Sequence, residues 1–241
     1  MPYYTGSIAA VPTARRQDYI DYARAAWPVF RDHGAERMVE TWGADVPHGH
    51  TTDFHRAVEA GEDETVVFSW IAWPDRATCD AAWQAMDEDG SMASLPEMPF
   101  DGSRMIYGGF APVLEAGQTM GSGYYQGFAL AVPVENRAVY SDMTRKGWEV
   151  FGGYGALGVV EAWGEDVPRG RRTDFYRATK ALDGEVPAFS WIAWPDRATC
   201  DRANEAMQAE GADQDFPELP FDGKRMMWGG FEPVFDSATG R

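Results

Sequence analysis

The stretch FSWIAWPDRATCD occupies Phe68–Asp80 and recurs without a change at Phe189–Asp201. The two copies lie 121 residues apart (189 − 68), and the same offset superimposes PFDG at Pro99–Gly102 on PFDG at Pro220–Gly223. The alignment needs no gap, and roughly half of its positions are identical. Self-similarity at a long fixed period indicates a duplicated structural unit. We therefore expect a first repeat at residues 1–115, a Gly-rich linker at 116–123, a second repeat at 124–236 and a tail at 237–241.

Each repeat predicts six elements in the order β-α-β-β-α-β, which is the ferredoxin-like unit. The first helix is predicted to begin after an N-cap at Thr13, and the second after an N-cap at Asp75. The predicted strands of the first repeat lie at residues 3–11, 35–46, 66–73 and 104–113. The apolar residues at helical spacing are Tyr19, Ala23, Ala26 and Phe30 in the first helix, and Cys79, Ala82 and Met86 in the second.

The strand at 66–73 is apolar on both faces. Phe68 and Trp70 point to one side, whereas Val67, Ile71 and Trp73 point to the other. A strand that is apolar on both sides is buried on both sides. A ferredoxin-like unit covers one face of its sheet with its own helices, so we expect the other repeat to cover the second face. The sequence thus predicts an α+β fold with two sheets face to face, forming one intramolecular pseudo-dimeric barrel, and a monomeric chain.

Charge and cysteine content limit the classes of partner and the compartment. The 241 residues include 38 acidic and 21 basic side chains, for a net charge of −17. Nucleic acids and anionic membranes both bind basic surfaces, so we expect neither as a partner. No apolar run approaches the length that spans a bilayer, and the N-terminus lacks the pattern of a signal peptide. Two cysteines are too few for disulfides to stabilise a chain of this length, and this predicts a reducing, cytoplasmic environment.

Glu40 is the most informative carboxylate, because it lies in the middle of an expected strand on the same face as Met38 and Trp42. A buried carboxylate requires a partner. Arg56 or Arg104 could form an ion pair with it. Alternatively, Glu40 contacts a ligand, and with a raised pKa it could act as a general base.

Aromatic residues at matching positions of the two repeats suggest a pocket for a planar ligand. Packing explains most aromatic residues in strands, yet several indoles in a small barrel can also form a stacking surface. The candidate pocket consists of Glu40, Trp42, Trp70, Arg104 and Tyr107 in the first repeat and Glu161, Trp163, Trp191, Arg225 and Trp228 in the second.

The loop after the second strand holds a weaker candidate for a metal site. His48, His50, Asp53 and His55 fall within PHGHTTDFH, and His-x-His with a carboxylate can bind a divalent metal. The second repeat has Arg169, Arg171 and Tyr176 in place of the histidines. An exposed loop with incidental histidines is therefore the favoured interpretation, and we expect neither a metal nor a cofactor. Phosphate-binding, dinucleotide-binding, zinc-protease and serine-hydrolase motifs are absent from the sequence.

Three motifs resemble the YbaA-like family of bacterial proteins. They are TDFxRA at Thr52–Ala57 and Thr173–Ala178, the FSWI segment, and PFDGxRMx[YW]GGF at Pro99–Phe110 and Pro220–Phe231. The resemblance covers nearly all of each repeat and implies the dimeric α+β barrel superfamily, in which two units usually pair as separate chains. It implies no activity and no catalytic residues. Other branches of that superfamily include cofactor-independent oxygenases, haem proteins and small-molecule sensors, which is an analogy of fold.

Three functions are compatible with these observations. The first is binding of a small planar or apolar molecule in a Trp-lined pocket between a sheet and its helices, with Glu40 and Arg104, or Glu161 and Arg225, orienting the ligand. The second is an oxygenase or isomerase that needs no metal or organic cofactor and acts on an enolisable substrate. The third is an interaction module without a pocket, which would show a packed barrel and an exposed apolar patch.

Overall fold

The computed structural model describes residues 1–210 and 219–240, and eight strands in this part of the chain form a closed barrel. The first repeat comprises β1 (Tyr3–Pro12), α1 (Arg16–Asp32), β2 (Arg37–Asp45), α2 (Phe54–Ala57), β3 (Glu64–Trp73), α3 (Arg76–Asp89) and β4 (Ile106–Gly117). The second comprises β5 (Tyr124–Pro133), α4 (Arg137–Gly153), β6 (Gly158–Asp166), α5 (Phe175–Ala178), β7 (Glu185–Trp194), α6 (Arg197–Glu210) and β8 (Met227–Asp236). Strand β4 thus includes the first two residues of the expected linker.

The strand order β1-β3-β2-β8-β5-β7-β6-β4 shows how the repeats join. Each repeat forms a four-stranded antiparallel sheet, and the sheets meet along two seams, where β2 pairs with β8 and β4 pairs with β6. The predicted pseudo-dimeric α+β barrel is therefore confirmed. The sequence predicted two sheets face to face. The structure adds that the edge strands of the two sheets hydrogen-bond to each other, which closes the barrel.

Aromatic rings from both repeats fill the barrel interior. The rings of Phe68 and Phe189 stack with centroids 4.3 Å apart, and those of Trp70 and Trp191 stack at the same distance. A Cβ atom at Gly127 would lie 2.9 Å from the ring of Phe68, so the backbone of β5 approaches the ring as only glycine allows. The identical FSW segments therefore meet at the centre of the barrel and form its core.

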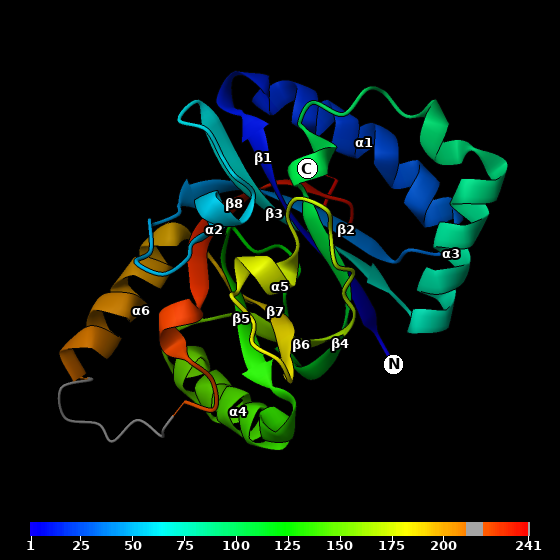
Figure 1. Cartoon of the computed structure of the whole chain (residues 1–241). Helices are drawn as coiled ribbons and strands as arrows, with labels where there is room; N and C mark the ends of the chain where they lie inside the picture. Colours follow the sequence, from blue (N-terminus) through cyan, green and yellow to red (C-terminus); the bar gives the residue numbers. More distant parts are fainter. Residues whose placement is uncertain (211–218, 241) are drawn as a thin grey trace.

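The helices cover the outside of the barrel. Helices α1 and α3 lie on one side of it, at the upper right of Figure 1, and α4 and α6 lie on the opposite side. The outward-facing Ile71 and Trp73 of β3 pack with the apolar side of α3, including the buried thiol of Cys79. Its counterpart Cys200 is also buried and free. Across residues 1–210 and 219–240, no helix has the length and apolar character needed to cross a membrane.

The two predicted N-caps have different outcomes. The Asp75 side chain accepts a hydrogen bond of 2.8 Å from the backbone N–H of Thr78, which confirms it as the cap of α3. The prediction for Thr13 is wrong. Residues Thr13–Arg15 form a single 3-10 turn, α1 begins at Arg16, and the Thr13 hydroxyl lies 2.8 Å from that of Thr65. The Thr13 hydroxyl therefore bonds to a side chain of β3 and does not cap α1.

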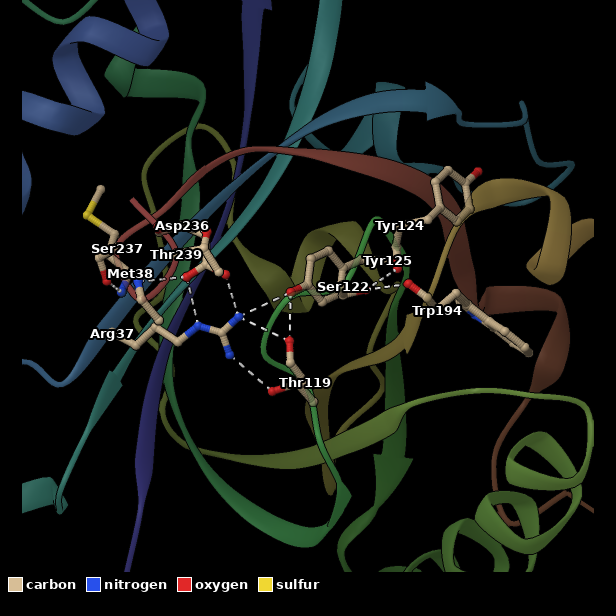
Figure 2. Close-up of polar contacts among 11 residues, drawn as sticks. Arg37, Met38, Thr119, Ser122, Tyr124, Tyr125, Trp194, Asp236, Ser237 and Thr239 are labelled. Atoms are coloured by element: carbon tan, nitrogen blue, oxygen red, sulfur yellow. Dashed lines mark hydrogen bonds and ion pairs between the residues drawn. The ribbon is translucent and has the colours of Figure 1, made fainter. Parts of the chain in front are cut away.

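A buried ion pair crosses the seam between β2 and β8. The Arg37 guanidinium donates to both carboxylate oxygens of Asp236, at 3.0 and 2.7 Å. The same guanidinium donates to the hydroxyl and carbonyl of Thr119 in the inter-repeat segment and to the Tyr125 hydroxyl, as Figure 2 shows. Arg37 therefore ties together both repeats and the connection between them. At the other seam the position equivalent to Arg37 is Gly158, so this clamp occurs on one side only.

Candidate functional site

A cavity of about 640 Å³ lies in the first repeat, between the outer face of the sheet and helices α1 and α3. Its floor includes Thr5, Ser7 and Ala9, which alternate along β1 and so point to the same side. Asp166, the last residue of β6 in the second repeat, and Pro168 in the loop that follows add to the wall. The cavity thus belongs to the first repeat but is completed by the second.

Four residues form a row across the floor of this cavity. In the strand register Tyr107 of β4 lies opposite Ser7 of β1, Ser7 opposite Ser69 of β3, and Ser69 opposite Glu40 of β2. Side chains of residues directly opposite each other in antiparallel strands lie about 5 Å apart on one face. The row therefore runs from the half-exposed Tyr107 at one end to a buried acid at the other.

The acid end of the row is a cluster of three side chains. The hydroxyls of Tyr19, on α1, and Ser69 both donate to Oε2 of Glu40, and they lie 3.1 Å from each other. Glu40 is only 9% exposed. Among the described residues none donates to its other oxygen, Oε1, although the residue lines the cavity. The cluster therefore offers one carboxylate oxygen to whatever occupies the cavity.

Burial controls the ionisation of this cluster. Removal from water raises the pKa of Glu40 to about 6, because the ionised carboxylate loses hydration, while the hydrogen bonds from Ser69 and Tyr19 partly offset this effect. Burial and the adjacent Glu40 raise the pKa of the Tyr19 phenol well above its ordinary value. Tyr19 therefore remains a donor, and Glu40 can exchange a proton near neutral pH.

The walls of the cavity are mostly aromatic and sulfur-containing. They are formed by Phe30, Trp83, Phe100, Met38, Met98 and Met105, among others. Near one end the hydroxyl of Tyr3 is buried and has no hydrogen-bond partner among the described residues. Burial raises the pKa of this phenol, so it remains protonated. The cavity is thus a largely apolar space whose polar atoms include Glu40 Oε1 and Tyr3 Oη, neither of which has a hydrogen-bond partner among the described residues.

The second repeat contains the same acid cluster. The Tyr140 hydroxyl donates to Glu161 at 2.6 Å, and the Ser190 hydroxyl donates to the same oxygen at 2.5 Å. Burial raises the pKa of Glu161 as well. Trp163 packs beside Tyr140 with ring centroids 6.2 Å apart. The acid cluster therefore occurs in both repeats. The neighbouring strand differs between them, because Ser7 of β1 corresponds to Phe128 of β5.

The aromatic and acidic candidates of the pocket have different surroundings. Glu40 and Tyr107 line the cavity. Trp70 borders it, but the rings of Trp70 and Trp191 stack on each other inside the barrel. Trp42 packs beside Tyr19, with centroids 6.1 Å apart, and Trp228 is 40% exposed. The expectation of tryptophan-lined walls is therefore replaced by one of mixed Phe, Tyr and Met walls, with Trp83 as the indole from α3.

The expected ion pair of Glu40 with Arg56 or Arg104 is wrong. The Arg56 guanidinium donates to the carbonyl of His50 and lies 3.4 Å from Asp53. The guanidinium of Arg104 binds both oxygens of Glu64, at 2.6 and 2.7 Å, and also Asp101. Arg225 repeats this pattern with Glu185 and Asp222. The arginines follow a turn just before β4 and β8, where the nearest carboxylates are those that begin β3 and β7, so they cannot orient a ligand at Glu40 or Glu161.

The histidine loop has structural contacts. The Asp53 side chain caps α2 by accepting from the backbone N–H of Arg56, and His55 Nε2 lies 3.1 Å from the carbonyl of Val46. The rings of His48 and His55 pack 4.5 Å apart, and His50 precedes the cap. In the part of the chain that the structure describes, no group of three or more His, Cys, Asp or Glu side chains could hold a metal ion.

Sequence reasoning overlooked Tyr19, Ser69 and the small residues of β1. Two signals were available. Ser69 is the polar member of an otherwise apolar outward face on β3, and it recurs as Ser190. In addition, the repeats differ at Ser7, which corresponds to Phe128. A phenyl ring at this position in the second repeat and a small serine in the first indicate that the first repeat has more unfilled space beside its sheet.

Comparison with known proteins supports the duplication. A family model described as a protein of unknown function, DUF1428, matches residues 2–102 and again 123–223. The protein YbaA of Escherichia coli strain K12, described as uncharacterized, is 48% identical over 116 residues, which is 48% of this chain and 99% of YbaA. YbaA of Shigella flexneri matches to the same extent. Such a relative corresponds in length to a single repeat.

Solved structures share the barrel at low sequence identity. A putative monooxygenase from Fusobacterium nucleatum is similar with a TM-score of 0.54 and 9% identity, over 98% of this chain and 93% of that one. An anthrone oxidase-like protein gives a TM-score of 0.52 and 12% identity, over 98% and 92% of the two chains. At such identities the likeness concerns the fold alone. Because the family match covers most of both repeats, the chain belongs to the DUF1428 family and carries its domain twice.

Proposed function

We propose that this protein binds a small, planar, largely apolar molecule in the cavity of the first repeat. The observation that supports this most is the cavity of about 640 Å³ with apolar walls and the acceptor atom Glu40 Oε1 at its floor. Ligand sites in proteins typically have volumes of about 300–1,000 Å³ and combine apolar walls with a few placed polar groups. An interaction module without a pocket would not need such a space.

Filling the cavity should weaken binding. Ala9→Leu places in the first repeat the residue that the second repeat has at the equivalent position, where Leu130 is buried. The apolar dye Nile red is expected to bind this variant roughly tenfold more weakly than the wild type, because the added side chain occupies ligand volume. Nile red fluorescence titration measures the effect.

The matched control is Ala14→Leu, which adds the same volume at an exposed position before α1. This control should bind Nile red as the wild type does. Equal binding by Ala9→Leu and the wild type would place the dye elsewhere and contradict the proposal.

The pKa of Glu40 favours a second candidate function, proton abstraction from an enolisable substrate without a cofactor. With a pKa of about 6 and a free oxygen in the cavity, the carboxylate can accept a proton from carbon at neutral pH. In that step the C–H bond breaks, its electron pair forms the enolate, and the proton goes to Glu40 Oε1. The hydroxyls of Tyr19 and Ser69 hold the carboxylate in place.

Deuterium exchange into the methylene group of anthrone, a planar enolisable ketone, tests this function. We expect the wild type to accelerate exchange and Glu40→Gln to lose about 100-fold or more of that acceleration. The rate should rise with pH through about 6, because only the ionised carboxylate accepts a proton. Glu36→Gln, at an exposed position, is the control. Acceleration that survives in Glu40→Gln would exclude Glu40 as the base.

The quaternary state and the compartment are part of the same proposal. We propose a monomer, because closure of the barrel within one chain gives every described strand two neighbours. We also propose a reducing compartment such as the cytoplasm, since Cys79 and Cys200 are buried free thiols.

A further inference from the structure

Strand β1 and its counterpart β5 differ on the face that lies beneath the helices. Thr5, Ser7 and Ala9 of β1 correspond to Gln126, Phe128 and Leu130 of β5. In the second repeat Leu130 is buried, and Phe128 packs against both apolar clusters beneath the helices of that repeat. Phe128 and Leu130 of β5 therefore place bulky side chains at the positions where Ser7 and Ala9 of β1 line the cavity.

The position of Phe128 relative to the acid is the informative part. Phe128 lies opposite Ser190 in the strand register, and Ser190 lies opposite Glu161. This is the same row as in the first repeat, with a phenyl ring where Ser7 leaves room. The second repeat thus shows which group fits beside the hydroxyl that binds the acid, namely one aromatic ring.

We infer that the chain has a single ligand site, in the first repeat, and that the Phe128 ring in the second repeat occupies the place that an aromatic ring of the ligand takes in the first. This inference rests on the proposed binding function and specifies its ligand class. It makes residues 7 and 9 of the first repeat, and their counterparts 128 and 130 of the second, the determinants of which repeat binds.

The polar atoms of the cavity specify the rest of the ligand. Glu40 Oε1 is an acceptor without a donor, and such a buried acceptor is best satisfied by a hydroxyl. Glu40, Asp80 and Asp166 all line the cavity, and none of its described lining residues is Lys or Arg. The nearby Arg76 is already shared by Asp80 and Glu165, each 3.5 Å away, so an anionic ligand would meet an excess of negative charge. The ligand class is a planar arene that carries a hydrogen-bond donor, in the simplest case a phenolic hydroxyl, and no negative charge.

The number of sites tests the inference. With 2-naphthol as the probe, equilibrium dialysis should find one site per wild-type chain. Ser7→Phe, which copies the second repeat into the first, should weaken binding by at least about tenfold. Phe128→Ser combined with Leu130→Ala, which copies the first repeat into the second at both positions, should create a second site. The two exchanges are matched controls for each other, and the Ser7→Phe result stands even if the variant of the second repeat proves unstable.

The donor requirement is tested with related probes. The methyl ether of 2-naphthol, which cannot donate, should bind the wild type roughly tenfold more weakly, and 2-naphthoate should not bind measurably. Glu40→Gln should reduce this discrimination between 2-naphthol and its ether. In the variant that combines Phe128→Ser with Leu130→Ala, Glu161→Gln should weaken only the newly created site.

The outcomes separate the inference from the function on which it rests. If the wild type binds neither 2-naphthol nor Nile red, the proposed binding function fails and the inference with it. If Ala9→Leu weakens Nile red but the wild type already has two naphthol sites, or Ser7→Phe leaves its single site intact, binding stands and the inference is overturned. Equal affinity for the naphthol and its ether would overturn the assigned ligand class.

Discussion

Replacing Phe68 with Ala should lower the free energy of unfolding by about 3–5 kcal/mol, the usual cost of deleting a fully buried aromatic ring. Phe68 is 0% exposed, its ring stacks on Phe189 at 4.3 Å, and Phe231 lies 5.3 Å away. Rings from both repeats surround the position, so the resulting cavity cannot close without moving both sheets. Equilibrium unfolding in urea, followed by tryptophan fluorescence, measures the loss.

Phe189→Ala is the matched variant, because it removes the same ring from the other repeat. We expect a similar loss, and a loss in the double variant that is smaller than the sum, since the two rings contact each other. A cost below about 1.5 kcal/mol for either single variant would show that the barrel interior repacks, and would contradict the view that the repeats stabilise each other through this stack.

Replacing Arg37 with Met should cost about 3–5 kcal/mol, because it leaves a buried carboxylate without its partner. The Arg37 guanidinium binds both oxygens of Asp236, whose side chain is 5% exposed, and also holds Thr119 and Tyr125 (Figure 2). Its loss therefore unpairs the Asp236 charge at the seam where the C-terminal strand closes the barrel. Thermal and urea unfolding would both report the change.

Two comparisons isolate the cause. Arg145→Met removes an ion pair with Asp142 in which both side chains are mostly exposed, and it should change stability by about 0.5 kcal/mol or less. Combining Arg37→Met with Asp236→Leu should recover much of the loss, because no unpaired charge remains. A double variant as unstable as Arg37→Met would instead assign the loss to the contacts with Thr119 and Tyr125.

Much of the fold could be predicted because it depends on local patterns. The alternation of Phe68 and Trp70 with Ile71 and Trp73 identifies a strand buried on both faces, and the structure places the first pair inside the barrel and the second beneath the helices. Asp75 caps its helix because a cap needs only the next three residues. The duplication then indicates that one unit occurs twice and that the copies cover each other.

The partner of Glu40 could not be predicted in the same way. Arg104 is a plausible partner by charge, yet Glu64 at the start of β3 lies nearer and binds it. Glu40 instead meets Ser69 through the strand register and Tyr19 through the packing of α1 on the sheet. Both contacts join segments distant in the chain, so only the arrangement of the elements brings them together.

The amino-acid pattern was sufficient for the repeat, the strand and helix order and the shared core, because periodicity and capping act over a few residues and identical segments adopt the same conformation. The closing seams, the Arg37–Asp236 clamp and the cavity beside Glu40 depended on the tertiary structure. A cavity is a volume left between side chains of separate elements, and its size at Ser7 becomes apparent only when β1, β3 and α1 are in place.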